Sequence, residues 1–386
     1  MTQQANNSSL QDFLGSWEAH FHRLRESDSL SESEKERVLS GLTKLREVFD
    51  DTWLWENTRI GFVHPLLSRL VNYTPSSQLW LADFGRKLDA LKSIAESGTL
   101  AKRLKNGREY LGAEAEVETA AKLIAAGITN IELSPKVTIR GKPKAPDMRA
   151  TLEGEDIYYE VAILGDSEDS VKAGQTFQEL VWPFDPEIIR FCQVHKILAK
   201  PRIEEFKAKV QSAISEVKET KEYCYVGEPG ILDYLVIHPS KREECKALVE
   251  RFGMKAEVIG PPIQRDEVRR LKRALQIKSQ QLPPERPGMI IVFSSLIYFE
   301  SPRMFYDTMV YELEDTVYDQ NNLVAGVIIS KAGEFGESEV YDKPHYTMVR
   351  NSSDGLVQET TIVIKNRYSK FSKLAITEKT LSAFTR

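Results

Sequence analysis

The sequence has few cysteines and no long run of apolar residues. Its three cysteines, Cys192, Cys224 and Cys245, lie far apart and form no C-x-x-C pair. That spacing argues against a disulfide framework and a structural zinc site, and it indicates a reducing compartment. The longest apolar stretch, 289–299, contains two serines and is too short to span a bilayer. Because the first residues also lack a basic and apolar leader, we expect a cytoplasmic protein with no membrane partner.

Neither sign of charge dominates the chain. Its 52 Lys and Arg residues and 57 Asp and Glu residues give a net charge of -5. The protein as a whole is therefore not a polycation that wraps nucleic acid, and a nucleic-acid site would need a local basic patch. The sequence contains no G-x-x-x-x-G-K-[ST] and no G-x-G-x-x-G motif, so the common nucleotide-binding loops are absent.

The spacing of apolar residues changes several times along the 386 residues. Helical spacing over 1–106 predicts a helical accessory domain. Segments rich in β-branched residues over 107–166 and 262–330 predict the two parts of an α/β core. Between them, 167–261 is expected to be an inserted unit of helices and a βαβ motif. The last part, 331–386, is predicted to hold one strand and a tail.

Two acidic residues are predicted to meet on a β-hairpin whose turn lies at 153–156. If residues 154–155 are the two central turn residues, Asp147 lies opposite Ala162. Glu160 is then the diagonal neighbour of Asp147 on the same face of the sheet. Diagonal neighbours are about 7–8 Å apart at the backbone, which lets two carboxylates lean together and share one divalent ion.

A third acidic residue, Glu116, lies on the preceding predicted helix, 109–126. It is seven residues before Leu123, so it shares that residue's face and points to the sheet if the helix packs there. A buried glutamate needs a partner, and a metal ion or a residue beside the metal would provide one. The alternative is a solvent-facing role like that expected of Glu114 and Glu118.

The order of a helix with Glu, a hairpin with Pro-Asp and an apolar strand with Glu resembles the PD-(D/E)XK, or restriction-endonuclease-like, nuclease superfamily. The resemblance covers residues 107–164 and 262–330. It implies a central mixed sheet flanked by helices, and magnesium or manganese as cofactor. It also implies that Asp147 and Glu160 are catalytic metal ligands and that Glu116 holds a second ion or a metal-bound water.

One position departs from the family pattern. The motif's lysine belongs two residues after Glu160, where this chain has Ala162. In the family that lysine activates water or stabilises the pentavalent phosphorus. The basic helix here resembles one that ends in K-x-x-Q-L-P in a bacterial group of nuclease-fold proteins. Lys278 of this motif is therefore the first candidate for a relocated catalytic lysine, Gln281 is expected on the same helix face, and Lys144 is the second candidate.

Positive side chains cluster on the same predicted helix. Residues 265–286 contain seven Lys and Arg against three acidic residues, a local charge of +4 in an acidic protein. Contact with phosphate groups explains this excess, and a solvated helix face is the alternative. The predicted nucleic-acid-binding residues are Lys142, Lys144, Arg269, Arg270, Lys272 and Arg273.

Two functions from different classes follow from these patterns. The first is a magnesium-dependent phosphodiester hydrolase that acts on DNA as an endonuclease, in defence against foreign DNA or in DNA repair. The second is a degenerate nuclease fold that binds nucleic acid or another protein, with Ala162 as the mark of lost catalysis. A lysine ammonium within reach of Asp147 and Glu160 would favour the first. The sequence does not determine the oligomeric state, and a homodimer is one option.

Overall fold

The structure is a computed structural model. It describes residues 14–59, 64–94, 96–139, 141–165, 171–173, 176, 179–180, 187–255, 266–294, 302–330, 334–335, 338–353 and 356–385. The chain divides into two compact units. Unit 1 comprises Met1–Leu164 and Val268–Arg386, and unit 2 comprises Gly165–Glu267.

Unit 1 begins with a series of helices and continues as a sheet with interspersed helices. Its helices are α2 (Trp17–Arg25), α3 (Glu32–Val48), α4 (Asp51–Arg59), α5 (Pro65–Val71), α6 (Pro75–Ala90), α7 (Ser97–Lys105), α8 (Tyr110–Ala125), α12 (Glu267–Ser279), α13 (Pro302–Tyr318) and α14 (Ala375–Phe384). Its strands are β1 (Asn130–Leu133), β2 (Val137–Ile139), β3 (Lys142–Lys144), β4 (Met148–Leu152), β5 (Glu155–Leu164), β9 (Gly288–Ser294), β10 (Leu323–Ser330), β11 (Glu334–Phe335), β12 (Glu339–Asp342), β13 (Tyr346–Ser353) and β14 (Leu356–Lys365).

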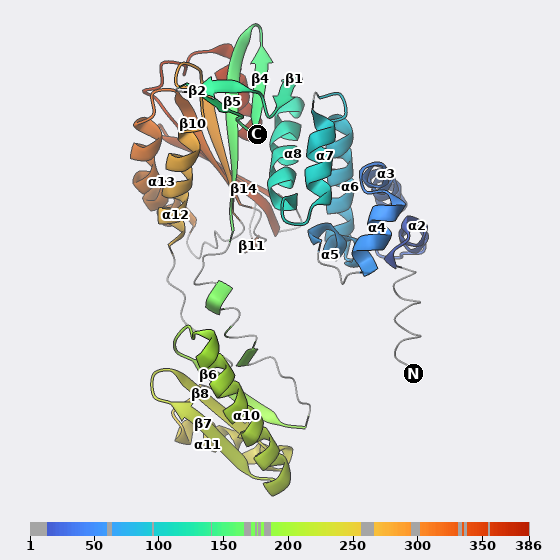
Figure 1. Ribbon diagram of the computed structural model, residues 1–386, viewed down its shortest axis with the longest axis vertical. Helices are drawn as coiled ribbons and strands as arrows, with labels where there is room; N and C mark the ends of the chain where they lie inside the picture. Colours follow the sequence, from blue (N-terminus) through green and yellow to red (C-terminus); the bar gives the residue numbers. More distant parts are fainter. Residues whose placement is uncertain are drawn as a thin grey trace. The chain divides into compact units, whose positions relative to one another are not determined.

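A large mixed sheet forms the centre of unit 1 (Figure 1). Within the described residues it has nine strands, in the order β1-β4-β5-β9-β10-β14-β13-β12, with β11 paired to β14. The pairs β5–β9 and β9–β10 are parallel, and the other pairs are antiparallel. A parallel pair needs a crossover connection, and α12 and α13 lie in the chain segments that make these two crossovers. The predicted α/β class with a mixed sheet flanked by helices is confirmed.

Helices cover both faces of this sheet. Along β5, Tyr159 and Val161 belong to one apolar core with α8 and α14, and the Tyr159 hydroxyl lies 2.9 Å from Thr380 Oγ1 of α14. Tyr158 and Ala162 belong to the opposite core, with α12 and α13. Figure 1 shows α8 on one side of the sheet and the pair α12 and α13 on the other. Since side chains alternate along a strand, Glu160 lies on the same face as Tyr158 and Ala162 and is directed toward α12.

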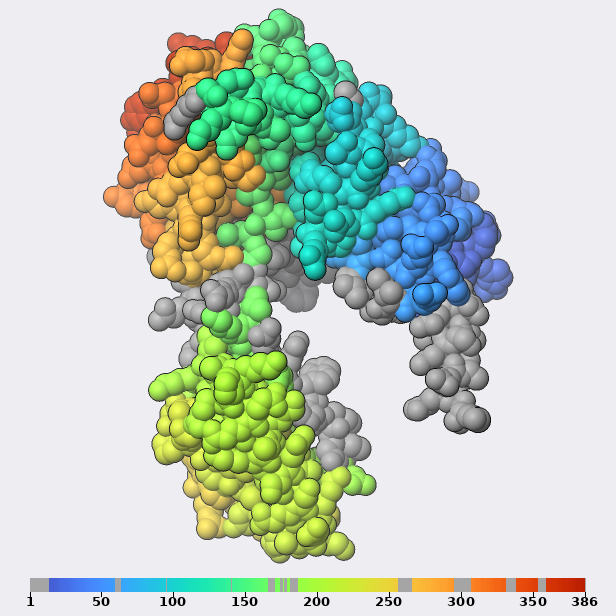
Figure 2. All heavy atoms as spheres, viewed as in Figure 1, coloured from blue at the N-terminus to red at the C-terminus, as the bar shows by residue number. Residues whose placement is uncertain are grey.

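Among the described residues, the N-terminal helices share one apolar core with the sheet. Buried residues of α2 to α7 and residues of the sheet belong to one continuous apolar cluster, which includes Trp17, Leu81, Leu104 and Tyr159. In Figure 2 the blue and cyan atoms of this N-terminal segment adjoin green atoms of unit 1. The expected separate helical domain over 1–106 is therefore part of unit 1, because its helices bury their apolar faces against each other and against α8.

Unit 2 is built on an antiparallel sheet. It contains β6 (Ile189–Val194), α10 (Lys200–Thr220), β7 (Tyr223–Glu228), β8 (Leu232–Ile237), η1 (Pro239–Glu244) and α11 (Cys245–Arg251). The strand order is β6-β8-β7, and both pairs are antiparallel. The strand (231–237) and the helix (241–252) with which the expected βαβ motif begins are confirmed as β8 and as η1 followed by α11. The last strand of that motif, predicted at 256–259, lies outside the described residues.

The part of the inserted unit before its βαβ motif, 167–222, was expected to be helical, but it contains strand β6. Cys192 and Val194 face the core that contains α10, while Ile189 and Phe191 face the core that contains α11. A strand that packs apolar residues on both faces does not alternate between apolar and polar residues, so its sequence carries no clear period of two.

The C-terminal part of the chain contains more structure than the single predicted strand. Strands β12, β13 and β14 extend the main sheet, and α14 packs on its α8 face. Two of the α14 residues in this core, Ile376 and Phe384, are fully or nearly fully buried. Among the described residues, no helix is long and apolar enough to cross a membrane.

Candidate active site

The hairpin of β4 and β5 positions the two predicted carboxylates. Its turn residues are Glu153 and Gly154, both with positive φ (52° and 84°), and Leu152 pairs with Glu155. Two positive φ values are the requirement of a type I′ turn, which suits the twist of antiparallel strands. The expected turn at 154–155 is thus wrong by one residue.

The corrected register changes which residues face each other. Met148 pairs with Tyr159. Continuing the register by one residue places Asp147 opposite Glu160 instead of opposite Ala162. The shift moves each partner by two residues, so both acidic residues stay on the face that was predicted. The two carboxylates are brought closer than the expected diagonal arrangement.

Lys278, in the last turn of α12, joins the two carboxylates. Its Nζ lies 2.6 Å from Glu160 Oε2 and 3.3 Å from Asp147 Oδ2. The side chains of Lys278 and Asp147 are 22% and 23% exposed, whereas that of Glu160 is 1% exposed. The cluster therefore has a buried carboxylate at its base and is reached from solvent past the other two residues.

Asp147 also closes the end of the β4–β5 ladder. Its Oδ2 accepts a hydrogen bond of 2.7 Å from the backbone N–H of Val161, which lies beyond the last paired residues. This bond fixes the carboxylate against β5, one residue from Glu160. A strand-capping role would by itself account for an aspartate here, but it does not account for the buried Glu160.

Burial and charge perturb the ionisation of this cluster. Burial, together with the neighbouring Asp147, raises the pKa of Glu160 to about 8 against the opposing effect of Lys278. Burial lowers the pKa of Lys278, but the two carboxylates outweigh this effect, so its pKa is raised above the usual value. A group with a strongly shifted pKa in a solvent-reachable cluster is typical of functional sites, although structural ion pairs shift pKa values as well.

Glu116 is buried on α8, as predicted, and its partner is Arg103 of α7. The guanidinium donates two hydrogen bonds, Nη1 to Oε2 at 2.8 Å and Nη2 to Oε1 at 2.7 Å. Burial raises the pKa of Glu116, and Asp147 raises it further, while Arg103 and Lys278 lower it. Both carboxylate oxygens of Glu116 accept hydrogen bonds from Arg103. A second metal ion would therefore have to compete with the guanidinium for Glu116.

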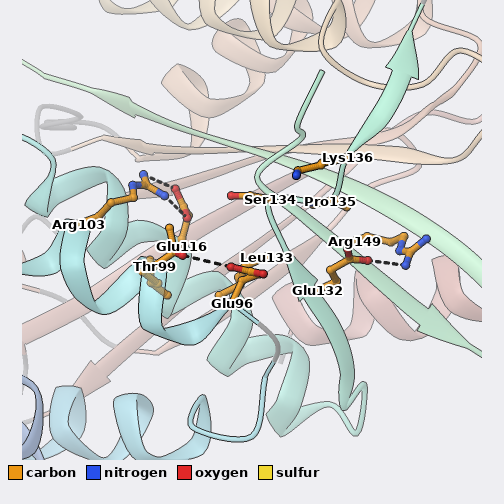
Figure 3. Close-up of a pocket in the computed structure, with 11 residues that line it drawn as sticks. Glu96, Thr99, Arg103, Glu116, Glu132, Leu133, Ser134, Pro135, Lys136 and Arg149 are labelled. Atoms are coloured by element: carbon orange, nitrogen blue, oxygen red, sulfur yellow. Dashed lines mark hydrogen bonds and ion pairs between the residues drawn. The ribbon is translucent and has the colours of Figure 1, made fainter. Parts of the chain in front are cut away.

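A pocket of about 520 Å³ lies beside this ion pair (Figure 3). Arg103 and Glu116 point toward each other on one wall, and Arg149 pairs with Glu132 on another. Its lining also includes Ser134, whose backbone N–H donates to the carbonyl of Asp147 at 2.9 Å. The pocket thus adjoins the segment that carries the first acidic residue of the site. Its lining carries both signs of charge, so it does not by itself indicate an anionic ligand.

The other predicted site residues lie outside the carboxylate cluster. Gln281 was expected on the helix face of Lys278, but α12 ends at Ser279, and Gln281 follows in a turn. Lys144, the second lysine candidate, is exposed on β3 with its neighbour Lys142. The structure therefore places Lys278, and not Lys144, at the two carboxylates.

The predicted basic surface lies along α12. Arg269, Lys272 and Arg273 are exposed, and Arg270 is half-buried. The apolar residues Leu271 and Leu275 face the sheet, which turns the exposed cations toward solvent. The surface ends at the turn of α12 that carries Lys278.

Sequence reasoning missed Arg103. The residue lies on α7, outside the segments that resemble the nuclease family, and its neighbours are ordinary for a solvated helix. The available signal was indirect, because a buried Glu116 required a cation. Identifying that cation requires the packing of α7 on α8, which local sequence does not specify.

The donor set fits a magnesium ion. Among the described residues there is no group of three or more His, Cys, Asp and Glu residues arranged to hold a metal. Magnesium, however, is usually bound by one or two carboxylates together with water and substrate phosphate. Within the described part of the chain, the buried Oε1 atom of Glu160 has no hydrogen-bond partner. A hard cation would satisfy that oxygen.

We compared the chain with family models, with curated proteins and with solved structures. None of the three comparisons found a match. The function is therefore inferred from the residues and their geometry.

Proposed function

We propose that this protein is a magnesium-dependent phosphodiester hydrolase that cleaves DNA as an endonuclease in the cytoplasm. The observation that carries the proposal is the contact of Lys278 Nζ with both Asp147 and Glu160. These three residues come from a strand end, a strand and a helix, and they are up to 131 residues apart in the chain. Two carboxylates with one lysine are the groups expected of a metal-dependent nuclease site.

The arrangement of elements supports a restriction-endonuclease-like core. The segments that carry the family resemblance are α8, the hairpin β4–β5, α12 and β9, and they adjoin each other in unit 1. The antiparallel hairpin is followed, through α12, by a strand parallel to β5. In this arrangement a residue at the end of α12 can replace a lysine at position 162, because Ala162 and α12 share one core.

Each residue then has a distinct role. Asp147 and Glu160 would hold the ion, and one donor would be Glu160 Oε1, which has no hydrogen-bond partner among the described residues. A bound magnesium ion would lower the pKa of its water and neutralise charge on the phosphate. The Lys278 ammonium would stabilise negative charge that develops on the phosphate. Glu116, held by Arg103, would contribute through its charge, and Gln281 would contact the phosphate only if the turn after α12 moves toward it.

The exposed cations of α12 suggest how the substrate would be held. Arg269, Lys272 and Arg273 lie on the same helix as Lys278 and are exposed. Such residues neutralise backbone phosphates without reading the base sequence. Lys142 and Lys144 would add to this surface from the β2–β3 hairpin. These contacts position a duplex and do not specify its sequence.

A binding module without catalysis is the second candidate. It is favoured by Ala162 at the motif position, where the family has its lysine. Cleavage of supercoiled plasmid, single-stranded DNA and RNA with magnesium, manganese or EDTA separates the two. The nuclease proposal requires metal-dependent cleavage that Glu160→Gln abolishes. Binding without cleavage of any substrate would favour the module.

A further inference from the structure

The Lys278 ammonium lies where a shared metal ion would have to bind. Its Nζ is 2.6 Å from Glu160 Oε2 and 3.3 Å from Asp147 Oδ2, so it directly contacts one oxygen of each carboxylate. Magnesium binds carboxylate oxygens at about 2.0–2.1 Å. An ion bound to these same two oxygens would be in contact with the ammonium and would repel it.

The alternative oxygens do not remove this conflict. Glu160 Oε1 has no hydrogen-bond partner within the described residues, and a metal ion could bind it. It belongs, however, to the same carboxylate whose other oxygen is 2.6 Å from Nζ. Asp147 Oδ2 also accepts a 2.7 Å hydrogen bond from Val161 N–H, which keeps this oxygen near the Lys278 ammonium. The two cations would therefore share one small, mostly buried site.

We propose that Lys278 competes with the divalent ion for the carboxylate pair, so that the site exchanges an internal cation for an external one. This inference rests on the proposed function, because the ion is the one that the nuclease would use. Lysine suits such an exchange, since its charge is carried on a flexible four-carbon stem. The displaced ammonium remains tethered at the end of α12, beside the site.

The exchange couples metal binding to DNA binding. Without DNA, moving the ammonium away from two carboxylates costs free energy that lowers the affinity for metal. With DNA bound, a phosphate gives the displaced ammonium a new anionic partner, which reduces that cost. Metal and DNA should therefore raise each other's affinity by the same factor. Lys278 thus disfavours loading of the site with metal until a substrate phosphate is present.

The test is the affinity for Mn²⁺ in the absence of DNA, measured from the electron paramagnetic resonance signal of the free ion. Lys278→Met and Lys278→Gln remove the competing charge. Lys373→Met removes a charge from an exposed lysine of the same unit. We expect both Lys278 variants to bind Mn²⁺ about tenfold more tightly than the wild type, and Lys373→Met to bind it equally. Equal or weaker binding by both Lys278 variants would overturn the exchange while leaving the proposed function in place.

A second measurement uses the unmutated protein and does not depend on how the variants fold. In crystals grown with Mn²⁺, the ion should lie at Asp147 and Glu160, and Lys278 Nζ should be beyond hydrogen-bond distance of Glu160 Oε2. An ion at both carboxylates with Nζ still in place would also overturn the exchange. If neither the wild type nor any variant binds Mn²⁺, the proposed metal site itself is wrong, and the exchange falls with it.

Discussion

Lys278 and Glu160 are 118 residues apart in the chain, and their Nζ and Oε2 atoms are 2.6 Å apart in the structure. The contact joins the end of α12 to Glu160, on the face of β5 that also carries Tyr158 and Ala162. Lys278 therefore provides an ammonium on the sheet face where the family's lysine would lie and where this chain has Ala162. The proposed catalytic centre depends on this relationship.

The raised pKa of Glu160 predicts a specific pH dependence of stability. The folded-state pKa is about 8, above the ordinary value of 4.5, so between these values the folded protein binds more protons than the unfolded chain. The contribution of Glu160 to stability is therefore full below the unfolded pKa and is lost as the pH rises toward 8.

The loss should amount to a few kcal/mol of unfolding free energy relative to Glu160→Gln, which has no proton to lose. Urea unfolding at pH 5, 6, 7 and 8 in EDTA measures it, and other titrating groups cancel in the difference between the two proteins. Parallel curves for the two proteins would show that Glu160 ionises normally.

Removing Arg103 should destabilise the fold through Glu116. Glu116 is almost fully buried and receives both guanidinium hydrogen bonds, so Arg103→Gln leaves a buried carboxylate without its cation. We expect a loss of about 2 kcal/mol, less than for a fully buried pair because Arg103 is partly exposed. Adding Glu116→Gln should recover part of the loss. A double-mutant cycle from denaturant unfolding measures the coupling, and additive losses would exclude it.

The exposed cations of α12 should determine the salt dependence of DNA binding. Removing one cation that neutralises a phosphate lowers the slope of log affinity against log salt by about 0.9. The double variant Lys272→Gln, Arg273→Gln should therefore lower the slope by about two, with little dependence on DNA sequence. Fluorescence anisotropy at several salt concentrations measures the slope, and Lys373→Gln serves as the control. An unchanged slope would mean that these residues only form a solvated helix face.

Magnesium should stabilise the folded protein by binding to its carboxylate pair. At a hundredfold excess of ion over the dissociation constant the gain is about 2.7 kcal/mol, which appears as a higher Tm. Asp147→Ala should abolish this shift, since it removes one of two ligands. The same rise in Tm in wild type and variant would show that the ion binds elsewhere.

The hairpin and its acidic residues could be predicted because their signals are local. Gly154 marked the turn, and the apolar segments on either side gave the strands. The one-residue error in the turn arose because Glu153 also adopts a positive φ, which an L-residue other than glycine rarely does and which sequence therefore does not signal. The faces were still correct, because the register changed by an even number of residues.

Contacts between distant elements were harder to predict. Lys278 could be proposed only from a resemblance, and its contact with Glu160 depends on the packing of α12 against the sheet. Arg103 had no such signal and was missed. Strand β6 was missed because both of its faces carry apolar residues, and Gln281 was misplaced because α12 ends two residues before it.

The most direct test of the account is the single-turnover rate of DNA cleavage by the wild type and by Lys278→Met, with metal and DNA both saturating. Loss of a positioned cation that stabilises developing phosphate charge should lower the rate by about 10²–10³, while the affinity for DNA is largely kept. Lys144→Met, which changes the other candidate lysine, should cleave at the wild-type rate under these conditions. Equal rates for the wild type and Lys278→Met would contradict the account, because Lys278 would then only neutralise two carboxylates in a folded core.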